Sequence, residues 1–335
     1  MDTFAASTLA EAALPVIDVS GLSSSKEAER RAVAEVIGRA STESGFFYVA
    51  NHGIPAGLIE AVFEETVRFF AQPEEAKERI AMSRSFCNRG WEPLKTQALD
   101  VTAPPDVKES AYFGRELSLD HPWVEARRFN HGPNQWPMDM PGFKPTMNAY
   151  YAAMLDLSER IMRGIALSLG LAEDYFAAFM REPMATLRLL HYPPQPADAL
   201  DRQTGAGAHT DYGATTLLLQ DENGGLQVRA ADGSWIHATP IPGTFVFNLG
   251  DMIARWTNDR YRSTVHRVVN LSGRERTSIP FFVSGNPDAV IECLPGCLAP
   301  GESPKYAPTT AEGHMREQYA RSYGAAKKAA AAAGS

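Results

Sequence analysis

The stretch His209-Thr-Asp-Tyr-Gly-Ala-Thr-Thr-Leu-Leu-Leu-Gln-Asp221 joins two metal-ligand side chains to a run of β-forming residues. Residues 215–220 are mostly β-branched or aliphatic, which is typical of a strand. From Thr186 onward such short runs recur, separated by turn signals such as Asn223-Gly-Gly225 and Asp232-Gly233. About eight short strands at this spacing favour an all-β sandwich or a jelly roll.

The N-terminal half has a different pattern. Residues 26–44, 56–71 and 145–169 carry apolar positions at helical spacing. Residues 83–145 are rich in glycine, proline and aromatic residues and show little periodicity, so we expect a long irregular region that shapes a substrate site. The sequence therefore predicts an α+β protein in which a mainly helical region, residues 1–180, packs on a β core.

The domain plan follows from length and composition. The chain has 335 residues, of which 44% are hydrophobic and 21% are charged, an ordinary balance for a globular protein. We expect a single catalytic unit over residues 1–335, with the jelly-roll core and its metal site in residues 186–295. The Ala-rich segment 324–335 is expected to be a flexible tail with a frayed helical end.

Charge and cysteine content narrow the class of protein. A formal net charge of −8 disfavours nucleic acid and anionic membranes as partners. No apolar stretch approaches the length of a membrane-spanning helix. Three cysteines are too few for a disulfide framework and favour a reduced, cytoplasmic protein. We therefore expect a small molecule as the partner; the sequence does not predict the oligomeric state.

A candidate metal site begins at His209-Thr-Asp211. On an extended strand, residues i and i+2 point to the same side, so the imidazole and the carboxylate can converge on one ion. His266, in the strand-like run 263–270, offers a third ligand from a neighbouring strand. Two histidines and one carboxylate on one side of a metal leave open positions, as iron(II) oxygen chemistry requires. Zinc is the rival metal, but the H-E-x-x-H signature of many catalytic zinc sites is absent.

A candidate anion site lies in the last clear strand. Arg276 and Ser278 are two residues apart, so they share one face of that strand, and Phe282 and Ser284 continue this face. A planar guanidinium beside a hydroxyl suits a carboxylate, since its fork binds both oxygens. Tyr192 is a candidate for a third hydrogen bond.

These residues carry a family resemblance. The chain resembles the isopenicillin N synthase-like branch of the 2-oxoglutarate/iron(II) dioxygenases, from Leu14 to about Tyr323. The matching stretches are LPVIDVSGL (14–22), GFFYVANHGIP (45–55), FFAQPEEAK (69–77), GPNQWP (132–137), LRLLHYPP (187–194), HTDYGATTLLLQD (209–221), GLQV (225–228), NLGDM (248–252) and the run from Tyr261 to Val268. One departure is Leu190, where many plant members have asparagine.

The resemblance implies a distorted double-stranded β-helix, a jelly-roll core with flanking N-terminal helices. It implies that iron(II) is bound by His209, Asp211 and His266. It also implies that Arg276, Ser278 and Tyr192 bind the distal carboxylate of 2-oxoglutarate, the cosubstrate used with O2. The expected reaction is hydroxylation, desaturation, cyclisation or demethylation of a small organic molecule, with release of succinate and CO2.

We expect four residues to line the substrate pocket: Phe282, Ser284, Tyr112 and Phe113. Two alternatives remain open from the sequence. One is an iron(II) oxidase of the isopenicillin N synthase type, which works without 2-oxoglutarate. The other is a non-catalytic small-molecule binding protein on the same scaffold, against which the intact ligand set argues.

Overall fold

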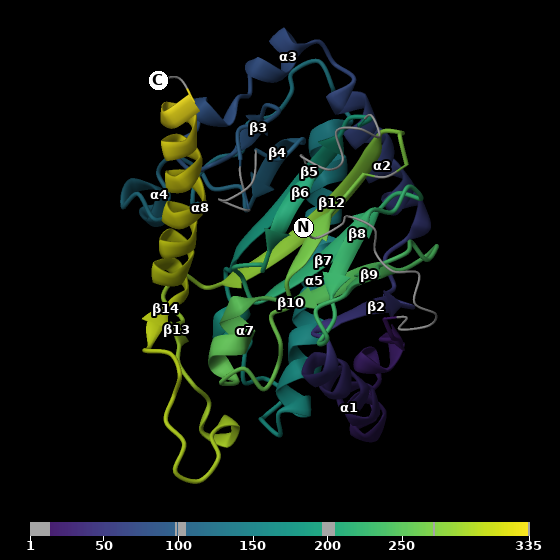
Figure 1. Ribbon diagram of the computed structural model, residues 1–335, viewed down its shortest axis with the longest axis vertical. Helices are drawn as coiled ribbons and strands as arrows, with labels where there is room; N and C mark the ends of the chain where they lie inside the picture. The colour runs from purple at the N-terminus through teal and green to yellow at the C-terminus, as the bar shows by residue number, and fades with distance from the viewer. Residues whose placement is uncertain (1–13, 98, 100–104, 196–204, 271, 334–335) are drawn as a thin grey trace.

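The structure, a computed structural model, describes residues 14–97, 99, 105–195, 205–270 and 272–333. An eight-stranded sheet forms its centre (Figure 1). Neighbouring strands run antiparallel except for the first pair, which is parallel. Across the sheet the order is β1 (Val16–Asp18), β2 (Phe46–Ala50), β10 (Phe245–Leu249), β7 (Thr215–Gln220), β12 (Arg276–Gly285), β5 (Met184–Tyr192), β4 (Glu109–Gly114) and β3 (Gly90–Glu92).

A smaller antiparallel sheet completes the β core. Its strands, in order, are β6 (Ala206–His209), β11 (His266–Val268), β8 (Leu226–Arg229) and β9 (Trp235–His237). Buried side chains of both sheets meet in one apolar cluster, which joins Tyr192 of β5 and Val246 of β10 to Val268 of β11. The two sheets thus face each other, and the predicted α+β class with a jelly-roll core and N-terminal helices is confirmed.

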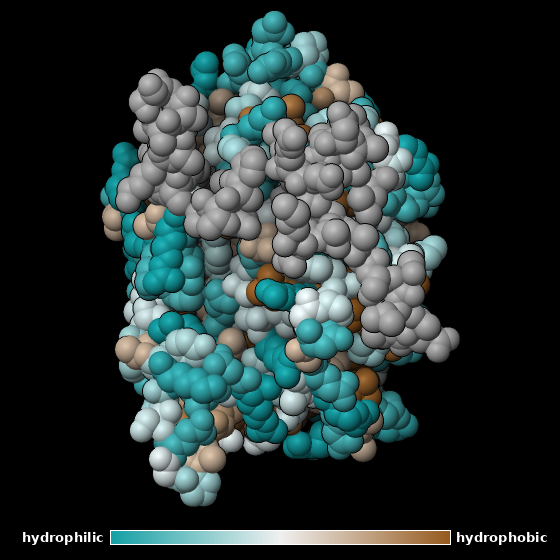
Figure 2. Space-filling view, viewed as in Figure 1, coloured by the Kyte–Doolittle hydropathy of each residue, from teal (hydrophilic) through white to brown (hydrophobic). Residues whose placement is uncertain are grey.

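Three long helices cover the outer face of the eight-stranded sheet. They are α1 (Glu27–Glu43), α2 (Ala56–Phe70) and α5 (Phe143–Ser168). The apolar stripe of α5 is buried against the sheet, where Tyr151 meets Phe281 of β12 edge-on at 5.1 Å. On the face shown in Figure 2, hydrophobic residues form small separate patches among hydrophilic ones. The apolar residues of α5 that pack on the sheet stabilise the fold by burial.

The turn from α1 into β2 depends on a glycine. Gly45 has a φ of +69°, and a Cβ at this position would lie 2.1 Å from the carbonyl oxygen of Arg262. Only glycine combines a left-handed backbone with so close an approach. This turn sets the start of β2, whose Phe46 contacts the ring of His266 edge-on at 5.2 Å.

The expectation of an irregular region over residues 83–145 is wrong in part. Both β3 and β4 lie within it and extend the central sheet. Polar residues in these strands hide the hydrophobic alternation. Glu109, for example, is buried because Lys77 donates to its carboxylate at 2.8 Å and Trp91 at 2.7 Å. A buried carboxylate with such partners is tolerated in a sheet, although a sequence segment that contains it is typical of a loop.

The remaining elements include a helix that the sequence did not predict and a helix of which it predicted only the C-terminal part. These are α7 (Asp251–Trp256) and α8 (Ala311–Ala333), which runs along one side of the molecule in Figure 1. The backbone is helical as far as Ala333, so the tail expected over 324–335 begins inside α8; its flexibility stays a prediction. The shorter elements are α3 (Glu74–Glu78), α4 (Pro122–Glu125), α6 (Ala177–Met180), β13 (Val290–Ile291) and β14 (Thr309–Thr310).

Two further observations concern the whole described chain. Its three cysteines, Cys87, Cys293 and Cys297, are all free thiols. Among the helices of the described residues, none combines the length and the apolar character that crossing a bilayer requires.

Candidate active site

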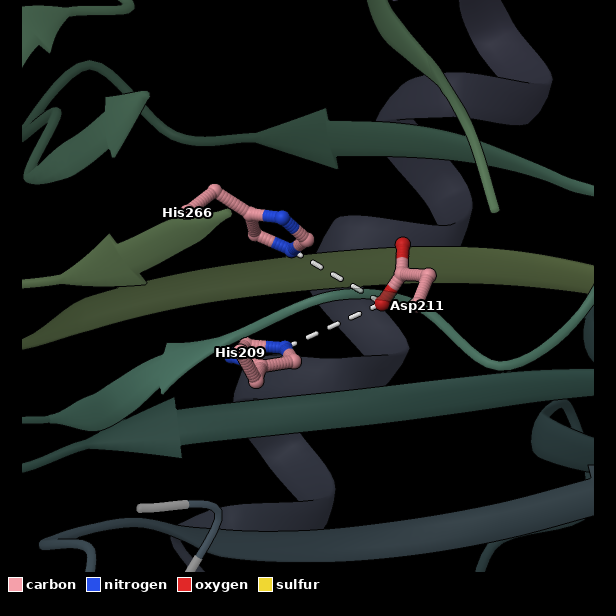
Figure 3. A group of neighbouring side chains, drawn as sticks. All are labelled: His209, Asp211 and His266. Carbon is pink, nitrogen blue, oxygen red and sulfur yellow. Dashed lines mark ion pairs between the residues drawn. The ribbon is translucent and has the colours of Figure 1, made fainter. Parts of the chain in front are cut away.

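Three potential metal ligands meet between the two sheets. His209 ends β6 and His266 begins β11, and the two residues are paired in register across these strands. Asp211 follows two residues after β6 ends. Its Oδ1 lies 3.7 Å from the Nε2 of His209 and 3.7 Å from the Nε2 of His266. Figure 3 shows both imidazole rings turned toward this carboxylate, and one ligand atom from each residue lies within 4.8 Å of the others.

Hydrogen bonds orient all three side chains. The Nδ1 of His209 lies 2.7 Å from the carbonyl oxygen of Gly207, and the Nδ1 of His266 lies 3.1 Å from that of Thr264. When each Nδ1 carries the proton and donates it to its carbonyl, the Nε2 lone pair faces the shared centre. Asp211 is similarly fixed.

The other oxygen of Asp211 is held by two donors. Thr216 donates its hydroxyl to Oδ2 at 2.6 Å, and Asn248 donates its amide at 2.7 Å. Oδ1 therefore remains directed at the two imidazoles. Thr216 and Asn248 lie on β7 and β10, so the central sheet positions a ligand that the small sheet does not carry.

The electrostatics favour the deprotonated forms that metals bind. The pKa of His209 is lowered to about 4, chiefly by burial and also by the neighbouring His266, while Asp211 opposes the shift. Burial raises the pKa of Asp211, but the two histidines and the hydrogen bonds from Asn248 and Thr216 outweigh it, so the net pKa is lowered. At neutral pH His209 is thus a neutral imidazole and Asp211 a carboxylate. Two nitrogen ligands and one oxygen ligand grouped in this way suit iron(II) and would leave its other coordination positions open.

A buried arginine lies in the same cavity. Arg276 is 0% exposed, and its guanidinium stacks 4.8 Å above the ring of Tyr192, its register partner on β5. It donates to the Ser278 hydroxyl at 2.9 Å, to the carbonyl oxygen of Gly224 and, at 3.5 Å, to Gln220. Burial raises the pKa of Tyr192, which keeps its hydroxyl protonated as a donor.

All of these partners of Arg276 are neutral. Within the described residues, no carboxylate lies within ion-pair distance of its guanidinium. The cavity that it lines also contains His209, Asp211 and His266. A buried cation without an acid is unfavourable unless an anion binds beside it.

An adjoining cavity is lined by His209 and Asp211. Of the residues predicted to line the substrate pocket, the structure brings Tyr112, Phe282 and Ser284 to this cavity. It does not bring Phe113 there. Phe113 follows Tyr112 on β4 and so points to the opposite face, where it stacks on Trp136 at 4.9 Å within the outer core. The prediction for Phe113 is corrected accordingly, because adjacent strand residues cannot share a face.

The sequence analysis missed several residues of these cavities. Thr186 and Arg188 lie an even number of residues from Tyr192 on β5, so they share its face, and this period of two could have identified both residues. Met315 and Tyr319 come from α8, and nothing in the sequence indicates where that helix packs.

Lys108 was missed as well, and it is buried with Asp106. Burial lowers the pKa of Lys108 to about 8, although Asp106 opposes the shift. The other oxygen of Asp106 accepts a hydrogen bond from the Gly207 amide at 2.9 Å, which fixes β6 just before His209.

Comparison with known families agrees with this geometry. Residues 14–139 match the model of the N-terminal region of non-haem dioxygenases of morphine synthesis, and residues 183–285 match that of the 2OG-Fe(II) oxygenase superfamily. The second match spans the three clustered ligands and Arg276. The chain belongs to the 2OG-Fe(II) oxygenase superfamily.

Relatives within the superfamily cover almost the whole chain. The 2-oxoglutarate-Fe(II) type oxidoreductase hxnY of Emericella nidulans is 44% identical over 324 residues, 95% of this chain and 93% of the relative. The 2-oxoglutarate-dependent dioxygenase citB of Monascus ruber is 39% identical, over 82% of this chain and 85% of the relative. A full-length Neurospora crassa protein, solved in complex with alpha-KG and thymine, is 35% identical with a TM-score of 0.82, over 95% of this chain and 100% of that chain.

These findings confirm the family, the fold and the reaction type. The protein is a non-haem iron(II) dioxygenase that depends on 2-oxoglutarate and O2. They favour this activity over the oxidase that works without 2-oxoglutarate.

Proposed function

We propose that His209, Asp211 and His266 hold the iron(II), and that Arg276, with Ser278 and Tyr192, binds the distal carboxylate of 2-oxoglutarate. The observation that carries this proposal is a buried guanidinium without an acidic partner in the cavity that contains the three ligands. A dianionic cosubstrate fits this cavity, since one of its carboxylates can reach the metal while the other binds Arg276.

The bound metal and cosubstrate supply the oxidising chemistry: O2 is reduced, 2-oxoglutarate is cleaved to succinate and CO2, and a substrate C–H bond is oxidised. The protein's own residues bind and orient. Arg276 fixes one end of the cosubstrate, and Thr216 and Asn248 hold Asp211 so that it can ligate through one oxygen. Phe282 lines both cavities, so its ring can contact both the cosubstrate and the substrate.

The substrate is a small organic molecule that binds beside the metal, against Tyr112, Phe282 and Ser284. Support comes from the adjoining cavity and from the solved complexes of the Neurospora crassa protein with thymine and with 5-formyluracil. The chain acts as one catalytic unit, in which residues 186–295 form the core; β1 to β4 support this because they join the same central sheet. Three free thiols support a reducing, cytoplasmic compartment.

Succinate formation tests the role of Arg276. Purified enzyme with iron(II) and O2 should convert 2-oxoglutarate to succinate. Arg276→Ala should lose a charge-assisted hydrogen bond worth about 1.5–3 kcal/mol, so the apparent 2-oxoglutarate affinity should fall about 10- to 150-fold. Arg276→Lys should restore only part of this, because an ammonium keeps the charge but not the two-pronged geometry.

Arg163→Ala is the matched control, because Arg163 pairs with Glu159 on the exposed side of α5. Its 2-oxoglutarate affinity should equal that of the wild type. Unchanged affinity in Arg276→Ala, with the fold intact, would contradict the assignment.

A further inference from the structure

Among the described residues that line the cavity beside the metal ligands, Arg188 is the only lysine or arginine. Arg188 is already paired with an acid. Arg188 lines the cavity, and its Nη2 lies 3.6 Å from the Oε2 of Glu92. Glu92 Oε2 also accepts hydrogen bonds from the Tyr112 hydroxyl at 3.0 Å and from the Ser110 hydroxyl at 3.2 Å. The guanidinium further donates to the Gln97 side-chain oxygen at 2.9 Å. Arg188 therefore belongs to a neutral, hydrogen-bonded group.

The other charges around the two cavities are balanced in the same way. Lys108 is paired with Asp106. Under the proposed function, Arg276 meets one carboxylate of 2-oxoglutarate, and the iron(II) meets the other carboxylate together with Asp211. Among the described lining residues no charge then remains for a substrate to neutralise. An ionised substrate would have to be buried without a counter-charge, which is unfavourable.

Shape limits the substrate further. The cavity has a volume of about 80 Å³, enough for only a few waters. Its aromatic lining includes Tyr112, Phe282 and Tyr319. Aromatic side chains pack best against flat rings, either stacked or edge-on. These dimensions suit a single planar ring with few substituents.

The polar side chains of the lining indicate which hydrogen-bonding groups the edge of that ring should carry. Arg188 has only N–H donors. Gln97 accepts from Arg188 through its oxygen, and its amide nitrogen can only donate. Arg188 Nη2 donates to the Ser110 hydroxyl as well as to Gln97. A ring oxygen of carbonyl type is an acceptor that matches the Gln97 amide nitrogen and the N–H groups of Arg188 other than these two. Buried donors that lack such an acceptor would disfavour a plain hydrocarbon.

We propose that the primary substrate is an uncharged, single-ring heteroaromatic compound with ring carbonyl oxygens, recognised by Arg188 and Gln97 and held between Tyr112 and Phe282. This inference rests on the proposed function, because the charge balance assumes iron(II) and 2-oxoglutarate in their sites. The group around Glu92 then acts as a charge filter, since it offers Arg188 as a donor while cancelling its charge.

Two probes that differ only by a carboxylate test the proposal. Uracil and orotate share one ring, and orotate is anionic at neutral pH. Each is titrated without O2 into protein loaded with iron(II) and 2-oxoglutarate, with calorimetric detection. We expect uracil to bind at least tenfold more tightly than orotate. Equal or tighter binding of orotate, or no uracil binding at millimolar concentration, would overturn the proposal.

Two variants identify the residues responsible. Glu92→Gln leaves Arg188 without its anion, so the preference for uracil over orotate should fall about tenfold or reverse. Arg188 lines both cavities, so Arg188→Met should weaken uracil binding about tenfold and 2-oxoglutarate binding by a clearly smaller factor. An unchanged uracil-to-orotate ratio in folded Glu92→Gln would contradict the charge filter. If either variant fails to fold, the wild-type ratio still decides the substrate class.

The same titrations separate this inference from the proposed function. Binding of 2-oxoglutarate to the iron-loaded protein is measured first, without any ring compound. Loss of that binding in Arg276→Ala supports the cosubstrate site whatever the ring probes do. A wild-type protein that binds 2-oxoglutarate through Arg276 but prefers orotate would overturn only the substrate class.

Discussion

The two faces of the eight-stranded sheet are built from alternate residues of the same strands, yet they differ in chemistry. On the outer face of β12, Ile279, Phe281 and Val283 join the large core beneath the helices. On the inner face, Arg276 and Ser278 line the cavity together with Phe282. The alternation of a strand thus separates residues that stabilise the fold from residues that bind ligands.

The separation has an energetic cost on the inner face. The outer core gains stability from apolar burial alone. The inner face buries Arg276, Arg188 and Lys108, and each buried cation requires hydrogen bonds or an acid to be tolerated. We infer that this face is retained for its chemistry, since apolar residues would pack there at lower cost.

The largest expected effect comes from removing a metal ligand. His209→Ala, Asp211→Ala and His266→Ala should each abolish turnover and iron binding but preserve the fold, because the ligands lie at the cavity and not in the outer core. Anaerobic iron(II) titration and circular dichroism check this. His237→Ala, an exposed histidine of β9 in the same small sheet, is the control and should behave as wild type. Wild-type iron affinity in any of the three ligand variants would refute the assignment.

Two adjacent phenylalanines sharpen the comparison of the faces. Phe281 is 0% exposed in the outer core, so Phe281→Ala should lower the free energy of unfolding by about 3–5 kcal/mol. Phe282→Ala should instead raise the KM for the primary substrate by at least about tenfold, and raise it more than the KM for 2-oxoglutarate. Chemical denaturation and steady-state kinetics measure the two effects. The reverse pattern would place Phe282 in the core and break the distinction between the faces.

The buried Lys108–Asp106 pair should make stability depend on pH. Folding lowers the pKa of Lys108 from 10.5 to about 8. Between these values the unfolded chain binds the proton more tightly, so stability should rise as pH increases from 8 to 10.5. The expected gain is about 3 kcal/mol. The double variant Lys108→Met/Asp106→Asn should lack this part of the pH dependence in urea denaturation. Identical curves for both proteins would show that the lysine does not titrate in this way.

A smaller effect is expected at Ser278. Its hydroxyl accepts a hydrogen bond from Arg276 at 2.9 Å. Ser278→Ala removes one neutral partner, worth about 0.5–1.5 kcal/mol, so 2-oxoglutarate affinity should fall about two- to tenfold. Thr277→Ala, on the opposite face of the same strand, should leave the affinity unchanged. A loss in Thr277→Ala as large as that in Ser278→Ala would argue against the face assignment.

Much of the site was predictable because strand alternation is a local property. The spacing of Arg276 and Ser278 placed both on one face, and the structure finds them hydrogen-bonded to each other. The spacing of His209 and Asp211 also suggested convergence, although Asp211 lies just beyond the end of β6. Its orientation comes from Thr216 of β7 and Asn248 of β10, not from a strand that contains Asp211 itself.

Other features depend on contacts between distant segments and could not be read from the sequence. The register pairing of His209 with His266 requires the order of strands in the small sheet. The strands within residues 83–145 were missed because Glu109 and its neighbours are polar and paired when buried. The placement of Tyr319 at the cavity depends on where α8 packs.

The most direct test of the account is whether iron(II) and 2-oxoglutarate share the cavity of the inner face. Chelation of iron(II) by a 2-oxo acid produces charge-transfer absorption in the visible range. When 2-oxoglutarate is titrated into the iron-loaded protein without O2, this absorption should therefore increase and then reach a plateau as the site fills. Phe281→Leu, a mild change on the outer face, should titrate like the wild type; Arg276→Ala should require about 10- to 150-fold more 2-oxoglutarate. A wild-type protein without this absorption, or an Arg276→Ala protein with an unchanged titration, would contradict the central claim.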